Sequence, residues 1–137
     1  MKKYICFAIL LVTFLTNAQN SKPDFSKLTT LDMVKVSVHG VDLQNNIWQD
    51  SLVKLKELKL RGTDADNFII VYFKFKTNYK KTLSVDEFYN EKIPVPMTQF
   101  FTDLESNCKV SFEDIVIKHK ENGKLFKISP LSFIIKT

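Results

Sequence analysis

Few side chains in this 137-residue chain have the chemistry of a catalytic or metal-binding group. The two histidines, His39 and His119, each fall on the polar side of an alternating pattern, and neither has another ligand type at metal-binding spacing. Cys108 would need a histidine beside it in space to act as a nucleophile. The residues therefore predict no catalytic set, no metal site and no cofactor site. They favour solvent-facing histidines and a small buried or half-buried thiol.

The acidic residues do not define a site by their spacing either. The segment "DAD", Asp64–Asp66, resembles a fragment of a calcium loop but lacks the glycine and the closing glutamate, so we expect a solvated turn. Asp86-Glu87 and Glu113-Asp114 fall in expected strands. Neighbours in a strand point to opposite faces, so neither pair is expected to form an acid–base couple.

Lysines alternate with aromatic residues in "FKFKTNYKK" and with leucines in "KLKELKLR". Aromatic and basic side chains together can bind single-stranded nucleic acid. The net charge is only +5, however, and a solvated lysine face that blocks edge-to-edge aggregation explains the first run. We expect no nucleic-acid partner. The second run is either a solvated face or a partner surface.

The N-terminus, "MKKYICFAILLVTFLTNAQN", has the organisation of a bacterial signal peptide. Lys2 and Lys3 precede an apolar run over residues 4–15, and small residues lead up to Ala18. The run is short for a bilayer core of about 30 Å. The pattern predicts cleavage after Ala18 and an exported protein, periplasmic or extracellular, with no stable membrane insertion afterwards. A buried N-terminal helix or a retained anchor is the alternative.

Cleavage would leave one domain of ordinary size. Cys6 would be lost with residues 1–18, so Cys108 would have no intramolecular disulfide partner and the apolar core would have to supply the stability. Residues 19–31 are polar and without period, which predicts an exposed lead-in. Residues 32–137 are expected to form a single β-rich domain.

Alternating hydrophobicity predicts about six strands, and "FIIVYFKFK" at 68–76 is the strongest of them. Its first half is apolar on both faces, which favours a central position, with residues 82–89 as its partner strand. Residues 48–60 are ambiguous, and we favour a short helix or irregular segment that passes into a strand. The other expected strands are around 34–38, 110–118, 124–128 and 131–136.

One helix is expected between the partner strand and residue 110. Met97, Phe100, Phe101 and Leu104 form a single helical stripe, Pro96 suits the first turn, and Asn107 is a plausible stop.

The strand at 110–118 carries a conflict of parity. Val110 and Phe112 share one face of a regular strand, whereas Ile115 and Ile117 share the other. A bulge at Glu113-Asp114 would bring all four inward, because one extra residue resets the pleat. Asn122-Gly123 then predicts a tight hairpin with φ above zero at both positions, and Ser129-Pro130 predicts a break before the last strand.

These elements predict a mainly β fold, an antiparallel sandwich-like β domain with one packed amphipathic helix. A pocket between sheet and helix, lined by Phe73, Phe100 and Phe101, would suit a small-ligand-binding or inhibitor-type domain, whereas a tightly packed core would oppose it. Trp48 is either a core anchor or an interface residue.

The segment Phe68–Lys136 resembles the C-terminal domain of the GldM/PorM proteins of gliding motility and type IX secretion. The residues that carry the resemblance are "FIIVYFKFKTN", "MTQFFTDLESN", "KVSFEDIVIK", "ENGK" and "ISPLSFIIK", in that order. The resemblance covers about half of the chain and rests on structural residues. It implies a non-enzymatic module that dimerises and binds a protein partner in the cell envelope.

The chain also departs from that family. GldM-type proteins are much longer and begin with an inner-membrane helix, Asn107-Cys108 stands where the family has a glycine, and the turn reads "KENG". The ion-driven motor role of the family therefore does not carry over.

Overall fold

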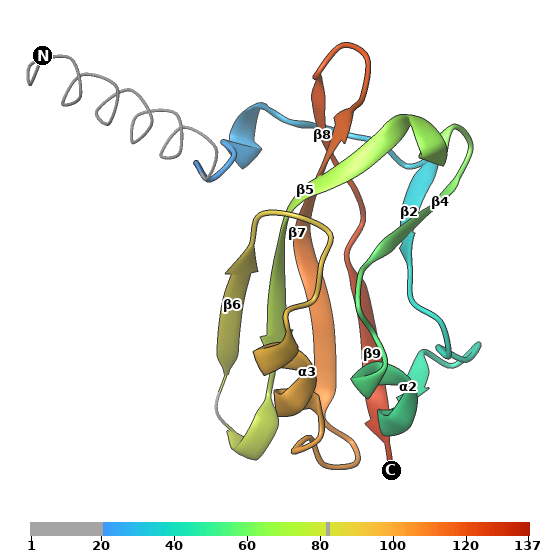
Figure 1. Cartoon of the computed structure of the whole chain (residues 1–137), viewed down its shortest axis with the longest axis vertical. Helices are drawn as coiled ribbons and strands as arrows, with labels where there is room; N and C mark the ends of the chain where they lie inside the picture. The colour runs from blue at the N-terminus through green and yellow to red at the C-terminus, as the bar shows by residue number, and fades with distance from the viewer. Residues whose placement is uncertain (1–20, 82) are drawn as a thin grey trace, which may run out of the picture.

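A computed structural model describes residues 21–81 and 83–137 (Figure 1). The expected signal peptide and its cleavage site after Ala18 lie outside the described residues. The described part is mainly β, with two sheets and a couple of helices, which confirms the expected sandwich-like β domain with a helix. None of its helices has the length and hydropathy that crossing a membrane requires.

Within the described residues, seven strands form the large sheet and two strands form the small one. The large sheet runs β1-β8-β7-β5-β6, and β9 pairs with both β7 and β3, whereas β2 pairs with β4 in the small sheet. The strands are β1 Thr29–Thr30, β2 Val34–Ser37, β3 Asn46–Trp48, β4 Lys59–Gly62, β5 Phe68–Thr77, β6 Ser84–Phe88, β7 Lys109–His119, β8 Leu125–Lys127 and β9 Leu131–Lys136.

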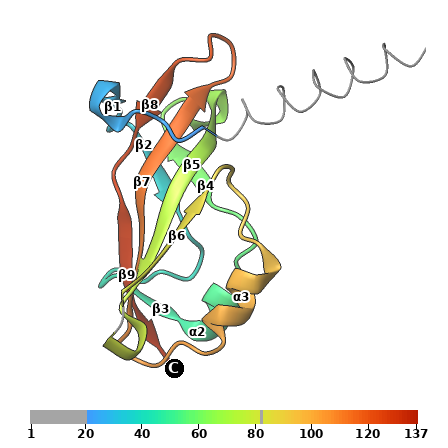
Figure 2. The same cartoon turned by 90° about the vertical axis from the view of Figure 1, so that its left-hand side faces the viewer.

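The helices are short. The α-helices are α2 Gln49–Val53 and α3 Val95–Phe101, and one-turn 3-10 helices lie at η2 Phe25–Lys27, η3 Ala65–Asn67 and η4 Tyr79–Lys81. The side view shows α2 and α3 on the same side of the large sheet (Figure 2). The preferred interpretation of residues 48–60 is confirmed, since α2 leads into β4 there.

The long antiparallel pair β5 and β7 forms the centre of the large sheet, as expected for β5. The bulge expected at Glu113-Asp114 is present, because the register shifts there and Asp114 has φ of 49°. A second shift follows Ile70 in β5. The bulge in β7 brings its buried side chains on either side of Glu113-Asp114 into one core, and the shift in β5 places Ile70 in the same core as Phe73.

The core lies between the inner face of the large sheet and a layer made of α2, α3 and the small sheet. Phe112 is fully buried and its ring contacts those of Phe73, Phe75 and Phe133. The small sheet contributes Val34 and Val36 to the same cluster. Tight burial of these side chains accounts for a stable domain without a disulfide in the described residues.

The helix α3 is shorter than its apolar stripe predicts. Pro96 lies in the first turn as expected, but the helix ends at Phe101, so that Leu104 is buried from the turn that follows. The cause is tertiary: the Gln49 side chain donates to the carbonyls of Phe101, Thr102 and Leu104 at 2.8 to 3.1 Å. The Phe101 carbonyl belongs to the last turn of α3, and those of Thr102 and Leu104 lie just beyond it, so the amide binds the chain where the helix ends.

The hairpin after β7 also differs from the expected tight turn. Gly123 has φ of 70°, whereas Asn122 is not among the positive-φ residues, and the His119 N–H donates to the Lys124 carbonyl across a four-residue loop. Ser129-Pro130 does break the return arm, since β8 and β9 pair with successive parts of β7.

Two short strands depart from the antiparallel pairing of the rest of the large sheet. The strand β1 pairs with β8, and β3 pairs with β9, both in parallel. The lead-in, described from residue 21, is largely exposed but attached to the sheet, because it contains β1 and places Phe25 against Tyr72 with ring centroids 5.2 Å apart. Parallel pairing requires a long crossover, and no local sequence pattern specifies one.

Candidate functional site

The structure does not bring the histidines and the cysteine together as a reactive set. Cys108 is buried immediately before β7, whereas His119 ends the same strand, so about 36 Å of extended chain separates them. His39 is exposed in the turn after β2. His119 is half-buried, lies edge-on to the Phe68 ring, and its Nδ1 accepts from the Glu121 N–H. The residues that the structure describes contain no cluster of metal ligands.

The Asp64–Asp66 segment is a turn, as expected. Asp64 adopts a left-handed conformation with φ of 58° and precedes η3. The Asp66 carbonyl accepts a hydrogen bond from the Lys120 Nζ. The Asp66 carbonyl oxygen therefore binds an ammonium group, whereas a calcium loop directs its oxygens at the cation.

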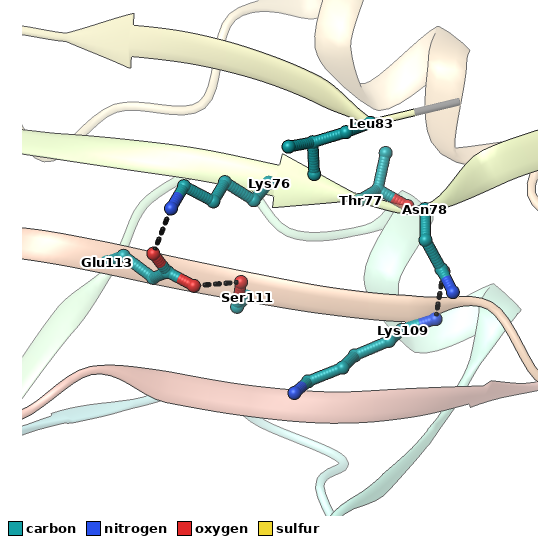
Figure 3. A pocket seen from close by; sticks show the side chains of 7 residues that line it. All are labelled: Lys76, Thr77, Asn78, Leu83, Lys109, Ser111 and Glu113. Atoms are coloured by element: carbon teal, nitrogen blue, oxygen red, sulfur yellow. Dashed lines mark hydrogen bonds and ion pairs between the residues drawn. The ribbon is translucent and has the colours of Figure 1, made fainter. Parts of the chain in front are cut away.

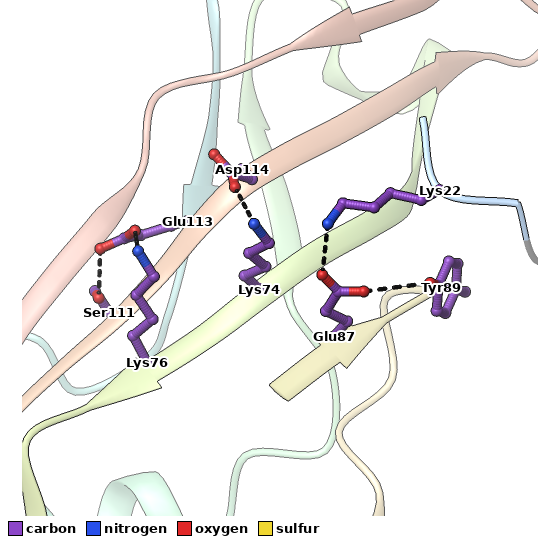
Figure 4. Close-up of polar contacts among 8 residues, drawn as sticks. All are labelled: Lys22, Lys74, Lys76, Glu87, Tyr89, Ser111, Glu113 and Asp114. Atoms are coloured by element: carbon purple, nitrogen blue, oxygen red, sulfur yellow. Dashed lines mark hydrogen bonds and ion pairs between the residues drawn. The ribbon is translucent and has the colours of Figure 1, made fainter. Parts of the chain in front are cut away.

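The Glu113-Asp114 pair does not point to opposite faces, which corrects the expectation from strand geometry. The bulge turns both carboxylates toward lysines of β5 on the outer face of the large sheet (Figure 4). Lys74 Nζ lies 2.8 Å from Asp114 Oδ2, and Lys76 Nζ lies 2.5 Å from Glu113 Oε2. The lysines of "FKFK" are therefore largely engaged within the sheet.

Ser111, Glu113 and Lys76 form a chain that superficially resembles an activated nucleophile. The Ser111 hydroxyl donates to Glu113 Oε1 at 2.9 Å, beside a hollow of about 300 Å³ (Figure 3). The Lys76 ammonium, with help from the Ser111 hydroxyl, lowers the pKa of the Glu113 carboxyl. A carboxylate with a lowered pKa is a weak general base, so this arrangement stabilises the sheet rather than activating the serine.

The N-terminal end of the described chain covers part of the same outer face. Lys22 Nζ lies 2.8 Å from Glu87 Oε1. This ion pair is the largest cause of the lowered pKa of the Glu87 carboxyl, and Tyr72 is the second. Tyr72 is fully buried, and burial together with the Glu87 carboxylate raises the pKa of its phenol. Within the described residues, the outer face at this point is closed by internal contacts.

A second surface, at the edge of the large sheet, is open. Strand β6 pairs with β5 on one side, and no other described strand pairs with it. Between β6 and α3 lies a hollow of about 350 Å³. Its lining is mostly apolar and consists of Asp86, Phe88, Pro94, Pro96, Met97 and Phe100. We call this hollow the β6–α3 groove.

The β6–α3 groove differs from the pocket that the sequence predicts. Phe100 does line it, but Phe73 and Phe101 are fully buried in the core and are not part of the lining. Phe88 takes the place of Phe73, whose ring stacks beneath it with centroids 4.9 Å apart. The alternation within β6 separates Asp86 from Glu87 as expected, with Asp86 in the groove and Glu87 on the outer face.

Exposed apolar side chains gather near this edge. Three of the described residues with large exposed side chains lie here. Leu83 precedes β6, Val85 lies on β6 and Val95 begins α3, and their exposed fractions are 66, 45 and 67%. Trp48 lies on β3, at another edge, and is 62% exposed, so it is not a core anchor. Sequence reasoning missed Asp86, Phe88 and Pro94, because a groove beside an edge strand depends on which strands remain unpaired. The available signal was the pair of prolines at the start of the helix, with Pro94 before α3 and Pro96 in its first turn.

Comparison with known proteins gives no further assignment: no protein-family model matches the chain, and no curated protein matches it.

Proposed function

We propose that the chain is an exported, non-enzymatic protein-binding module of the bacterial cell envelope, similar to the terminal domain of GldM/PorM proteins and linked to type IX secretion or gliding. The observation that carries the proposal is the open β6 edge beside an apolar groove. Exposed strand edges bind extended segments of partner proteins through main-chain hydrogen bonds.

The arrangement of the charged residues supports a binding role over catalysis. The serine, glutamate and lysines of the outer face are bonded to one another, and the Cys108 thiol is buried. From Phe68 to Lys136 the described strands and α-helix run in the order β5, β6, α3, β7, β8 and β9. This order supports the resemblance as part of the proposal.

The proposal is tested in the native cells by site-specific photo-crosslinking. A photoreactive amino acid replaces Val85 on β6 and, as a matched control at an exposed turn, Asp64. We expect the Val85 variant to give an adduct with a secretion or gliding component, identified by mass spectrometry, and the Asp64 variant to give none. The exported protein should begin at Gln19. Equal adducts from both positions, or a chain retained in the cytoplasm, would contradict the proposal.

A second candidate function is binding of a small apolar molecule in the β6–α3 groove. The observation that favours it is the lining of Phe88, Met97 and Phe100 with a single carboxylate. Pro96→Asp places a charge in the groove at an exposed first-turn position, where acidic residues are tolerated. An apolar fluorescent dye should bind the unmodified chain and not this variant; absence of dye binding to the unmodified chain would remove this candidate.

A further inference from the structure

We propose, resting on the function above, that β6 accepts an extended partner segment in which a lysine or arginine lies two residues from an aromatic or branched aliphatic residue. The basic side chain would face Asp86, and the apolar side chain would enter the β6–α3 groove. The partner is thus a different protein with this local chemistry, rather than a second copy of the chain.

The backbone of β6 supplies the first part of the argument. The strand is antiparallel to β5 over Phe73↔Phe88 to Thr77↔Ser84, so alternate backbone groups of β6 point away from the sheet. Natural edge strands are commonly blunted by lysine, proline or a bulge. β6 reads "SVDEF" and contains neither lysine nor proline, and its pairing with β5 shows no register shift.

The position of α3 supplies the second part. Asp86 and Phe88 are two residues apart, point to the same side of β6 and line the groove. Side chains of an added strand alternate in the same way, so its inward-facing residues would lie beside Asp86 and Phe88. The partner residue that lies opposite Phe88 would rest on an apolar floor. This floor is formed by Pro94, Pro96, Met97 and Phe100.

The charges select the occupant. Asp86 is the charged member of the described groove lining, and it is exposed, so a cation opposite it gains an ion pair. Self-pairing of β6 about its centre would place Asp86 opposite Asp86 of a second copy, where like charges destabilise a sheet. Pairing with a basic segment removes this penalty and adds an attraction, which distinguishes a foreign strand from a second copy.

The outer side of the edge is consistent with the same occupant. Val85 is 45% exposed and points to the face opposite the groove, between the chain's own Lys76 and the free edge. Glu87, also on that face, is already bonded to Lys22. Within the described part of the chain, the carboxylate that an incoming strand meets without an ion-pair partner is therefore the one in the groove.

The experiment uses a display library of random nine-residue peptides, selected on the purified full chain and counter-selected on its Asp86→Lys variant. We expect enrichment of a basic residue two positions from an aromatic or aliphatic one. The best peptide, made synthetically, should bind at least about tenfold more weakly to Asp86→Lys. Changing its basic residue to glutamate should restore binding to that variant and weaken binding to the unmodified chain.

Glu121→Lys is the matched control, because it makes the same charge change at the exposed hairpin tip. It should leave peptide affinity unchanged, and thermal melting should show that both variants are folded. Hydrogen exchange should slow at backbone amides within residues 84–88 when the peptide binds. The proposal is overturned if no peptide is enriched, if the enriched peptides lack a basic residue, or if protection appears elsewhere.

The outcome separates this inference from the function on which it rests. A secretion or gliding partner that crosslinks at Val85 but is not displaced by the selected peptide would leave the module's function standing and exclude this recognition rule. Peptide binding at β6 without any envelope partner would support the rule and remove the proposed role.

Discussion

The outer face of the large sheet and the β6–α3 groove share the strand β6, yet their side chains are used in opposite ways. On the outer face, lysines meet carboxylates, Ser111 donates to Glu113, and Lys22 covers Glu87. In the groove, apolar side chains and one carboxylate face solvent. The charged and hydroxyl side chains therefore hold the sheet together. The surface available to a partner consists mainly of apolar side chains.

The largest effect on stability is expected in the core that supports both regions. Phe112→Ala should destabilise the domain by about 3 to 5 kcal/mol, because a fully buried ring in contact with three others is lost and leaves a cavity. Phe88→Ala, at the half-buried edge of the groove, should cost only about 1 to 2 kcal/mol. Urea unfolding of the two variants measures the difference; equal losses would mean that the groove is part of the core.

The packing of β7 into the core could be predicted from the sequence, since it depends on which residues of one strand share a face. The mismatch between Val110-Phe112 and Ile115-Ile117 predicted the bulge, and the structure places it at Asp114. The end of α3 could not be predicted in the same way, because the Gln49 side chain that accounts for it comes from 52 residues away in the sequence. The apolar stripe alone predicted a helix that includes Leu104.

The groove was accessible to sequence reasoning only in part. Phe100 was expected beside a pocket and is there, but the other wall depends on β6 being an edge. That property is set by long-range pairing, including the parallel contacts of β1 with β8 and β3 with β9. Asp86 carried no distinguishing local pattern.

A smaller effect on stability is expected from two hydroxyl groups, one without a hydrogen-bond partner and one with a partner. Thr77 is 2% exposed, and its Oγ1 has no hydrogen-bond partner among the described residues, so Thr77→Val should stabilise the domain by up to about 1 kcal/mol. Ser111→Ala removes a hydroxyl that is bonded to Glu113 and should destabilise it by about 1 kcal/mol. Thermal unfolding compares them, and loss of stability in both would show that Thr77 has a partner after all.

The outer face should also show its charge pairing through pH. The pKa of Glu113 is lowered from its ordinary value of 4.5, chiefly by Lys76, so its stabilising contribution is present above pH 4.5 and is lost as the pH falls through the folded-state pKa. Because the pair is about one-third exposed, the contribution is about 0.5 kcal/mol after screening. Unfolding of Glu113→Gln and the unmodified chain should differ at pH 7 and converge in acid; a constant difference would contradict the pairing.

The smallest effect concerns whether Lys22 closes the outer side of β6. The Lys22–Glu87 pair is half-exposed and screened by solvent, so Lys22→Gln should leave the free energy of unfolding almost unchanged. The pKa of Glu87 should nevertheless rise toward its ordinary value, because the largest cause of its lowering is removed, and carboxyl NMR titration measures this rise. An unchanged Glu87 pKa would mean that the N-terminal segment does not stay on β6 in solution. The edge would then present two free carboxylates, Asp86 and Glu87, on opposite faces, and a partner strand with basic residues on both of its faces would fit it better than one with a single basic residue.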